Sequence, residues 1–141
     1  MRFAGYAAIF DRPDHGGDII RKGAFTAALR RAQGEKGVNV PLFWQHDPRQ
    51  PVGTIESLSE DKRGLRVIAQ VDEDQAAALV SSGAVKGLSF GYRVRGATRG
   101  IYRELTDVEL IEISLVTNPM QPLARVHAVE NTPINNTGTQ Y

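Results

Sequence analysis

The stretch AVKGLSFGYRV, residues 84–94, decides between two folds for this chain. Its central letters, GLSFG, match the G-x-S-x-G pattern of the nucleophile elbow in α/β-hydrolases, where the serine lies on a sharp turn between a strand and a helix. Here the pattern runs on into YRVR, which is aromatic and β-branched and carries no helix cap, and then meets Gly96 and Gly100. The stretch therefore predicts a strand that carries Ser89, and the hydrolase elbow is rejected.

The order of the histidines supports the same conclusion. An α/β-hydrolase has its serine first, then the acid and then the histidine. The only histidine after Ser89 is His127, near a polar terminus, whereas His15 and His46 precede the serine. If Ser89 is a nucleophile, it therefore acts on a different scaffold.

The composition limits the size and the partners of the protein. A chain of 141 residues is long enough for one domain but too short for a doubly wound hydrolase sheet with its helices. Its 17 Lys and Arg and 16 Asp and Glu residues leave a net charge of +1, so we expect no direct contact with nucleic acid. The absence of cysteine excludes thiolate catalysis and disulfides. No segment has the length of a signal peptide or a membrane span, so we expect a soluble intracellular protein that does not bind membranes.

Most of the chain reads as strands separated by turns. The clearest strand is LRVIAQV, residues 65–71, whose alternating apolar positions predict one buried face. Two helices are expected, the first from Phe25 to a C-terminal glycine at Gly34, and the second with Asp72 as N-cap and Gly83 as terminator. Further strands are predicted in residues 2–10, 38–44, 52–58 and 87–94, with a break at QHDPRQP, and residues 101–116 read as one long strand or a hairpin.

These elements together predict an α+β protein that is mainly β. We expect a closed or partly closed antiparallel β-barrel flanked by helices. Residues 1–127 would form the domain, and residues 128–141 would form a flexible polar tail.

Ser89 is the candidate nucleophile, and its chemistry requires two further groups. A serine hydroxyl is a poor nucleophile at neutral pH unless a base lies within hydrogen-bond reach, and a third group should fix the tautomer of that base. His46 follows a predicted strand, where a rigid element positions it beside open solvent. Glu112 is a carboxylate in the apolar segment LIEISLV, so it either points outward or meets a partner.

Each of these residues also has an ordinary structural interpretation. Ser89 can be a small residue packed beneath a neighbouring strand, because G-x-S-x-G is short and common. His46 can be a surface residue, and Glu112 can face water, as we expect for Glu109. The segment DHGGD and the pair His46 and Asp47 match no metal-ligand spacing, so we expect no metal and no cofactor.

The two glycines around Ser89 also call for an explanation. A strand interior normally avoids glycine unless a bulge or a close backbone approach requires it. We therefore expect Gly87 and Gly91 to let an extended substrate approach the serine.

Five blocks of sequence, taken in order, carry a family resemblance. They are GYAAIFDRPDHGGDIIRKGAF, VPLFWQHDPRQPVGTIESL, DKRGLRV, SSGAVKGLSFGYRV and LIEISLVTNPMQP, which together span most of the chain. With these blocks the chain resembles the prohead proteases of HK97-type tailed phages and of the related gene transfer agents. The resemblance implies a serine endopeptidase with a fold like that of the herpesvirus assembly proteases, a β-barrel surrounded by helices.

The resemblance also implies roles for individual residues. The histidine of WQHD is the general base, the serine of GLSFGY is the nucleophile and the acid of EISLV is the third member, and these are His46, Ser89 and Glu112 here. Asp107 or Glu109 would take the third place if the strand register differed.

Partners and location follow from the same resemblance. The implied substrates are the scaffold or a prosegment of the major capsid protein and the protease itself, with the portal as a further candidate partner. The implied assembly is a homodimer or another homo-oligomer, working inside the prohead in the cytoplasm of the bacterial host. Self-cleavage in the polar tail would end the activity after maturation.

Two other classes of function compete with a capsid protease. A non-catalytic, scaffold-binding capsid-assembly module would have the same fold, but an inactive relative is expected to have lost at least one of Ser89, His46 and the acid. A serine esterase acting on small molecules would need a formed apolar pocket.

Overall fold

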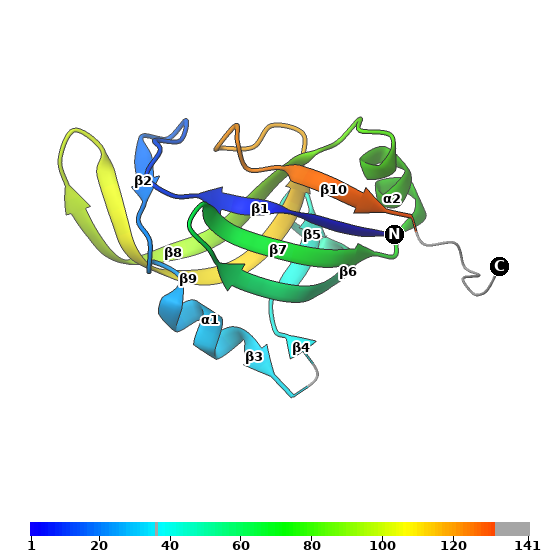
Figure 1. Cartoon of the computed structure of the whole chain (residues 1–141), viewed down its shortest axis with the longest axis horizontal. Coiled ribbons are helices and arrows are strands. Elements are labelled where there is room, and N and C mark those ends of the chain that lie inside the picture. Colours follow the sequence, from blue (N-terminus) through cyan, green and yellow to red (C-terminus); the bar gives the residue numbers. More distant parts are fainter. Residues whose placement is uncertain (36, 132–141) are drawn as a thin grey trace.

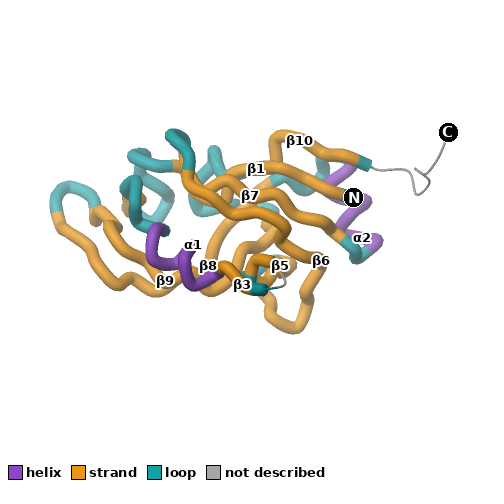
Figure 2. Tube along the Cα trace, turned by 60° about the horizontal axis from the view of Figure 1, so that its bottom comes forward, coloured by secondary structure: helices purple, strands orange, loops and turns teal. Residues whose placement is uncertain are grey.

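The computed structural model describes residues 1–35 and 37–131, which form one large curved sheet, a small two-stranded sheet and two short helices (Figure 1). The large sheet is built mainly from long strands, and two of them, residues 87–99 and 103–116, form a hairpin that extends beyond the rest of the molecule (Figures 1 and 2). In chain order the elements are β1 Arg2–Ile9, β2 Asp18–Ile20, α1 Thr26–Ala32, β3 Gln33–Gly34, β4 Gly37–Val38, β5 Pro41–Trp44, β6 Asp47–Glu60, β7 Gly64–Val71, α2 Asp74–Ser81, β8 Gly87–Arg99, β9 Arg103–Val116 and β10 Val126–Glu130.

The main sheet has eight strands in the order β10-β1-β7-β6-β5-β9-β2, and β8 pairs with β9 beside this path. Most neighbours are antiparallel, but β5 and β2 both run parallel to β9. The sheet is therefore mixed, which corrects the expectation of a purely antiparallel one. The mainly β character with few helices is as expected.

The expected barrel is not confirmed. The strand path ends at β10 and β2, and within the described residues no ladder joins those two strands. Isolated bridges join Phe10 to Ile20 and Gly87 to Arg125, and the second is supported by hydrogen bonds from Leu88 N to Ala124 O (2.9 Å) and from Val126 N to Lys86 O (2.8 Å). This second bridge attaches the beginning of β8 to the segment that leads into β10.

The core lies on the concave side of the sheet and is almost entirely aliphatic and aromatic. The alternation predicted in β7 is confirmed, because every second residue from Leu65 to Val71 is at most 2% exposed. Burial of these side chains is the main source of stability. The other large side chains that are fully buried are Phe3, Phe25, Leu42, Ile55, Leu88, Leu105, Val108, Ile113 and Leu115.

Both predicted helices are present, and the N-cap of the second differs from the one expected. At α2 the N-cap is Glu73 and not Asp72, and the Glu73 carboxylate accepts hydrogen bonds from the first backbone N–H groups of the helix. Gly83, which has a φ of +80°, ends this helix as predicted. At α1 no side chain at the N-cap contributes, and Glu60 of β6 instead accepts hydrogen bonds from two backbone N–H groups just before the helix.

The C-terminal strand extends the domain beyond its predicted boundary. β10 pairs with β1 as far as Glu130, so residues 128–130, which we expected in the tail, belong to the sheet. The rest of the predicted tail, residues 132–141, lies outside the described residues. Neither described helix has the length and apolar character needed to cross a membrane.

Candidate active site

A two-residue turn between β5 and β6 positions His46. Gln45 and His46 both adopt left-handed backbone conformations, with φ of +52° and +61°, which non-glycine residues adopt only when the surroundings hold them there. The turn is fixed to the end of β9 by hydrogen bonds from Gln45 N to Leu115 O (2.9 Å) and from the Gln45 side chain to Thr117 (3.1 Å). The break expected over QHDPRQP is confined to these two residues, because β6 already begins at Asp47.

Glu112 lies on β9 and meets the His46 imidazole directly. The parallel pairing of β5 with β9 brings the end of β5 beside residues 113–115, so the turn and the carboxylate come together. Glu112 Oε2 lies 2.5 Å from His46 Nδ1, and Glu112 is only 7% exposed. The hydrogen bond to Glu112 raises the pKa of His46 above its ordinary value, and partial burial opposes this shift.

A third residue, Ser114, contacts both His46 and Glu112, and the sequence analysis did not single it out. Its hydroxyl is fully buried, donates a hydrogen bond to Glu112 Oε1 (2.7 Å) and accepts one from His46 N (3.1 Å). One side chain thus holds both the carboxylate and the backbone of the turn. The available signal was spacing, because Ser114 lies two residues after Glu112 and so shares its face of the strand.

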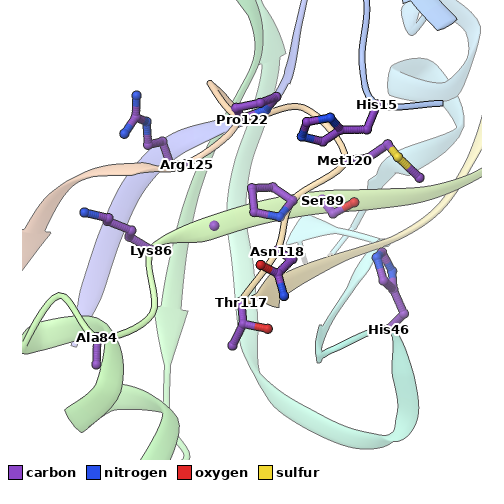
Figure 3. Close-up of a pocket in the computed structure, with 12 residues that line it drawn as sticks. His15, His46, Ala84, Lys86, Ser89, Thr117, Asn118, Met120, Pro122 and Arg125 are labelled. Carbon is purple, nitrogen blue, oxygen red and sulfur yellow. The ribbon is translucent and has the colours of Figure 1, made fainter. Parts of the chain in front are cut away.

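Ser89 lies on the neighbouring strand β8, directly opposite Ser114. It is half-buried and lines an open groove together with His46, as Figure 3 shows. Within the described residues the Ser89 hydroxyl has no hydrogen-bond partner, so it is available to a ligand. Because Glu112 occupies Nδ1 of the imidazole, Nε2 is the ring nitrogen left to accept a proton from the groove.

The glycines of the GLSFG motif have a different use from the one expected. A Cβ on Gly91 would overlap Oε2 of Glu112 and lie 3.0 Å from its Cδ, so the missing side chain makes room for the carboxylate. A Cβ on Gly87 would lie 2.6 Å from Val116 O and 2.8 Å from Cδ of Pro119. Both glycines therefore permit close packing of β8 on β9 and on the following loop.

The groove around Ser89 has a volume of about 570 Å³. His46 and His15 lie toward one side of Ser89, and Lys86 and Arg125 lie on the other side (Figure 3). Among the described residues, no Asp or Glu lines this groove. Its remaining lining comes from the start of β8 and the loop after β9: Ala84, Gly87, Thr117, Asn118, Pro119, Met120 and Pro122.

A second, smaller cavity of about 150 Å³ also contains Ser89 and His46 in its lining. Its other polar residues include Asp18, which is 7% exposed and accepts two hydrogen bonds of 2.8 Å from Arg103 and one from the Tyr92 hydroxyl. The pairing with Arg103 lowers the pKa of Asp18, and burial raises the pKa of Tyr92 to about 12. The two sides of Ser89 thus differ in charge.

The remaining candidates from the sequence lie elsewhere. His127 packs against the Tyr6 ring, with centroids 5.7 Å apart. Glu109 lies 3.9 Å from Arg93, and Asp107 pairs with Gly96 farther along the hairpin, so neither reaches His46. Within the described residues no group of three His, Cys, Asp or Glu side chains is arranged to hold a metal ion.

The chain is similar to proteins of one family and to solved structures. The profile of the family described as Caudovirus prohead serine protease matches residues 1–139. The chain is 34% identical to the prohead protease of Enterobacteria phage HK97 over 92% of its own length and 60% of that protein, and 27% identical to the capsid polyprotein of Pseudomonas phage PAJU2 over 65% of its length and 16% of that protein. The chain thus spans less than two thirds of these curated relatives.

Among solved structures, the fold is similar to that of the capsid assembly protease of bacteriophage T4, with a TM-score of 0.69 and 18% identity over 84% of this chain and 82% of that one. It is also similar to the KSHV protease, solved with a hexapeptide phosphonate inhibitor, with a TM-score of 0.59 and 12% identity over 93% of this chain and 65% of that one. At these identities the likeness concerns the fold.

Proposed function

The chain belongs to the Caudovirus prohead serine protease family, and from this premise we propose that it is a serine endopeptidase with Ser89 as nucleophile, His46 as general base and Glu112 as the third catalytic residue. The observation that carries the proposal is the contact of 2.5 Å between Glu112 and Nδ1 of His46, in a groove that also contains Ser89. A base whose tautomer is fixed beside an accessible hydroxyl is the arrangement that activates a serine.

The reaction follows from the positions of these atoms. Ser89 Oγ attacks the carbonyl carbon of a peptide bond while Nε2 of His46 takes the hydroxyl proton and later transfers it to the leaving amine. Glu112 accepts the Nδ1 hydrogen and stabilises the imidazolium that forms. Water then enters the groove, and the same base removes its proton so that the acyl-enzyme is hydrolysed.

The charge that develops on the substrate oxygen requires donors near Ser89. Backbone N–H groups held in place before the reaction stabilise such an oxyanion at low cost in reorganisation. The loop of residues 117–122, which follows β9 and lines the groove, is the segment that we propose supplies them. The N–H groups of Phe90 and Gly91 are the alternative.

Membership of this family indicates the class of protein that the chain would cleave. We propose that the chain cleaves the scaffold or a prosegment of the major capsid protein during phage or gene-transfer-agent prohead maturation, that it also cleaves itself, and that it acts inside the prohead in the host cytoplasm. The relatives support this by name, as a prohead protease and as a capsid polyprotein. A homo-oligomer and contact with the portal belong to the same proposal.

The test compares Ser89→Ala with wild type on the cognate capsid protein. Both are incubated with that protein, and intact mass and gels identify the fragments. Ser59→Ala, an exposed serine on β6, is the matched control. We expect fragments with wild type and the control and none with Ser89→Ala.

A fluorophosphonate probe gives a second readout that does not need the capsid protein. We expect one covalent adduct, located on Ser89. Cleavage of the capsid protein by Ser89→Ala would refute the assignment of the nucleophile. An intact capsid protein with wild type, under conditions where assembly proceeds, would favour the non-catalytic scaffold-binding module.

A further inference from the structure

The groove beside Ser89 has a cationic end that the proposed mechanism does not use. Lys86 and Arg125 are both exposed and line this end. Within the described residues neither forms an ion pair, and no carboxylate lines the groove. Two cations beside an open groove without an anion of their own attract an anionic group from a ligand.

The backbone holds the two cations next to each other. Gly87 bridges Arg125, and Val126 N donates to Lys86 O at 2.8 Å. Both residues therefore start from fixed, neighbouring points and lie on the same side of Ser89, as Figure 3 shows. An arrangement fixed by the backbone loses less entropy on binding than one built on a mobile loop.

The distance between the cationic end and Ser89 indicates which residue of a bound substrate would contact the two cations. Lys86 precedes Ser89 by three residues, which corresponds to about 10 Å along an extended chain at about 3.3 Å per residue. A polypeptide that lies extended in the groove advances by the same rise. Its side chain two or three residues from the bond that is cut would thus reach the cations.

We propose that Lys86 and Arg125 form a subsite for an acidic side chain, Asp or Glu, two or three residues from the cleaved bond of the substrate. This inference rests on the proposed endopeptidase function, which it deepens by naming a substrate feature. The second cavity beside Ser89, in contrast, has the carboxylates of Asp14 and Asp18 in its lining.

The test uses peptides that contain the cleavage site mapped in the capsid protein. Pairs of peptides carry Glu or Gln at the second and third positions on either side of the cut bond. Two readouts are taken: kcat/KM with active protein, and binding to Ser89→Ala by fluorescence anisotropy. The variants are Lys86→Gln with Arg125→Gln, and the matched control is Lys62→Gln with Arg99→Gln, two exposed cations outside the groove.

We expect wild type and the control to prefer the Glu peptide at one position by roughly two- to fivefold for each cation, as exposed ion pairs allow. The preference should disappear in the Lys86 and Arg125 double variant and weaken with added salt. Replacing both residues with Glu should reverse the preference toward a Lys peptide. Fluorophosphonate labelling of Ser89 should stay unchanged in all of these variants.

Equal kcat/KM and equal binding for Glu and Gln at every position would overturn the subsite, as would a preference that survives the double variant. The two proposals fail in different ways. If no peptide is cut but Ser89→Ala binds the Glu peptide through Lys86 and Arg125, the endopeptidase assignment is wrong and the subsite stands. If wild type cuts without regard to charge, the endopeptidase stands and the subsite is wrong.

Discussion

Replacing Glu112 with Gln removes one charge from the pair that orients the base while it keeps the shape of the side chain. A hydrogen bond to a charged group contributes about 1.5–3 kcal/mol. The His46 side chain is 43% exposed, so solvent screens its interaction with Glu112. The contribution of this hydrogen bond therefore lies near the lower end of that range, about 1.5 kcal/mol. Without this charge the pKa of His46 should fall in the variant.

The atoms around Glu112 also predict a loss of turnover. If the Gln oxygen faces His46 Nδ1, its amide nitrogen must face Ser114, whose fully buried hydroxyl hydrogen then loses its acceptor. If the amide nitrogen faces His46 instead, the imidazole is forced into the tautomer that cannot accept the serine proton. Acid-to-amide changes in such triads reduce kcat by up to about 10⁴, and we expect a reduction of about 10²–10⁴ here.

The assay is kcat and KM from pH 5 to 9 on the mapped peptide, with NMR titration of the histidines. A general base must be neutral, so the acid limb of kcat/KM in wild type should have its midpoint above the ordinary value of 6.5, because the pKa of His46 is raised. In Glu112→Gln that midpoint should shift to lower pH. Glu109→Gln, on the same strand, is the matched control. A midpoint unchanged by Glu112→Gln, together with kcat within threefold of wild type, would refute the reasoning.

Three further changes test other parts of the structure. Ser114→Ala should reduce kcat about tenfold at nearly constant KM, because the Glu112 carboxylate and the backbone of the turn lose their shared hydrogen-bond partner. Ser114→Thr, which keeps the hydroxyl, should recover part of the rate. An unchanged kcat in the alanine variant would contradict the positioning role. Gly91→Ala should displace the Glu112 carboxylate and reduce kcat at least tenfold while circular dichroism stays native, whereas Gly96→Ala on the same strand meets Thr106 and Asp107, away from His46, and should stay active; equal rates for the two would count against this explanation. Asp18→Asn should lower the thermal midpoint at pH 7 by a few degrees and make that midpoint less dependent on acid. The pKa of Asp18 is lower in the folded protein than in the unfolded chain, so the charged carboxylate stabilises the fold above the unfolded pKa, and this stability is lost as the pH falls through the folded pKa. Midpoints that stay equal to wild type from pH 3 to 7 would show that this ion pair contributes nothing.

Local patterns in the sequence were sufficient to predict most of the strands and both helices. The alternation in residues 65–71 reports a half-buried strand directly, and Gly83 reports a helix end because it takes a left-handed conformation. Gly96 was misleading as a breaker, since β8 runs on to Arg99, whereas Gly100 does follow the end of the strand. The cross-strand pairing with β9 supplies the hydrogen bonds that hold this glycine-containing strand.

The site was predicted only in part, because its key contacts join residues that are distant in sequence. A reactive serine, a histidine after a strand and a carboxylate in an apolar strand can each be recognised from local sequence. Whether Glu112 faces His46 depends on the parallel register of β5 on β9, which no local pattern encodes. Ser114 and the cationic pair were missed for the same reason, since a serine in a strand and two exposed cations are ordinary features until the fold brings their partners near.

The parallel pairing of β5 with β9 also has a consequence for the order in which this chain acquires activity. Ser89 and Glu112 lie on the two strands of one hairpin, a local structure that forms early because only a short loop has to close. His46 joins them only across a separation of 66 residues, and such non-local contacts form slowly. A partly folded chain therefore carries the proposed nucleophile and acid before it carries the proposed base, so the proposed proteolysis would begin only when the rest of the molecule has been built.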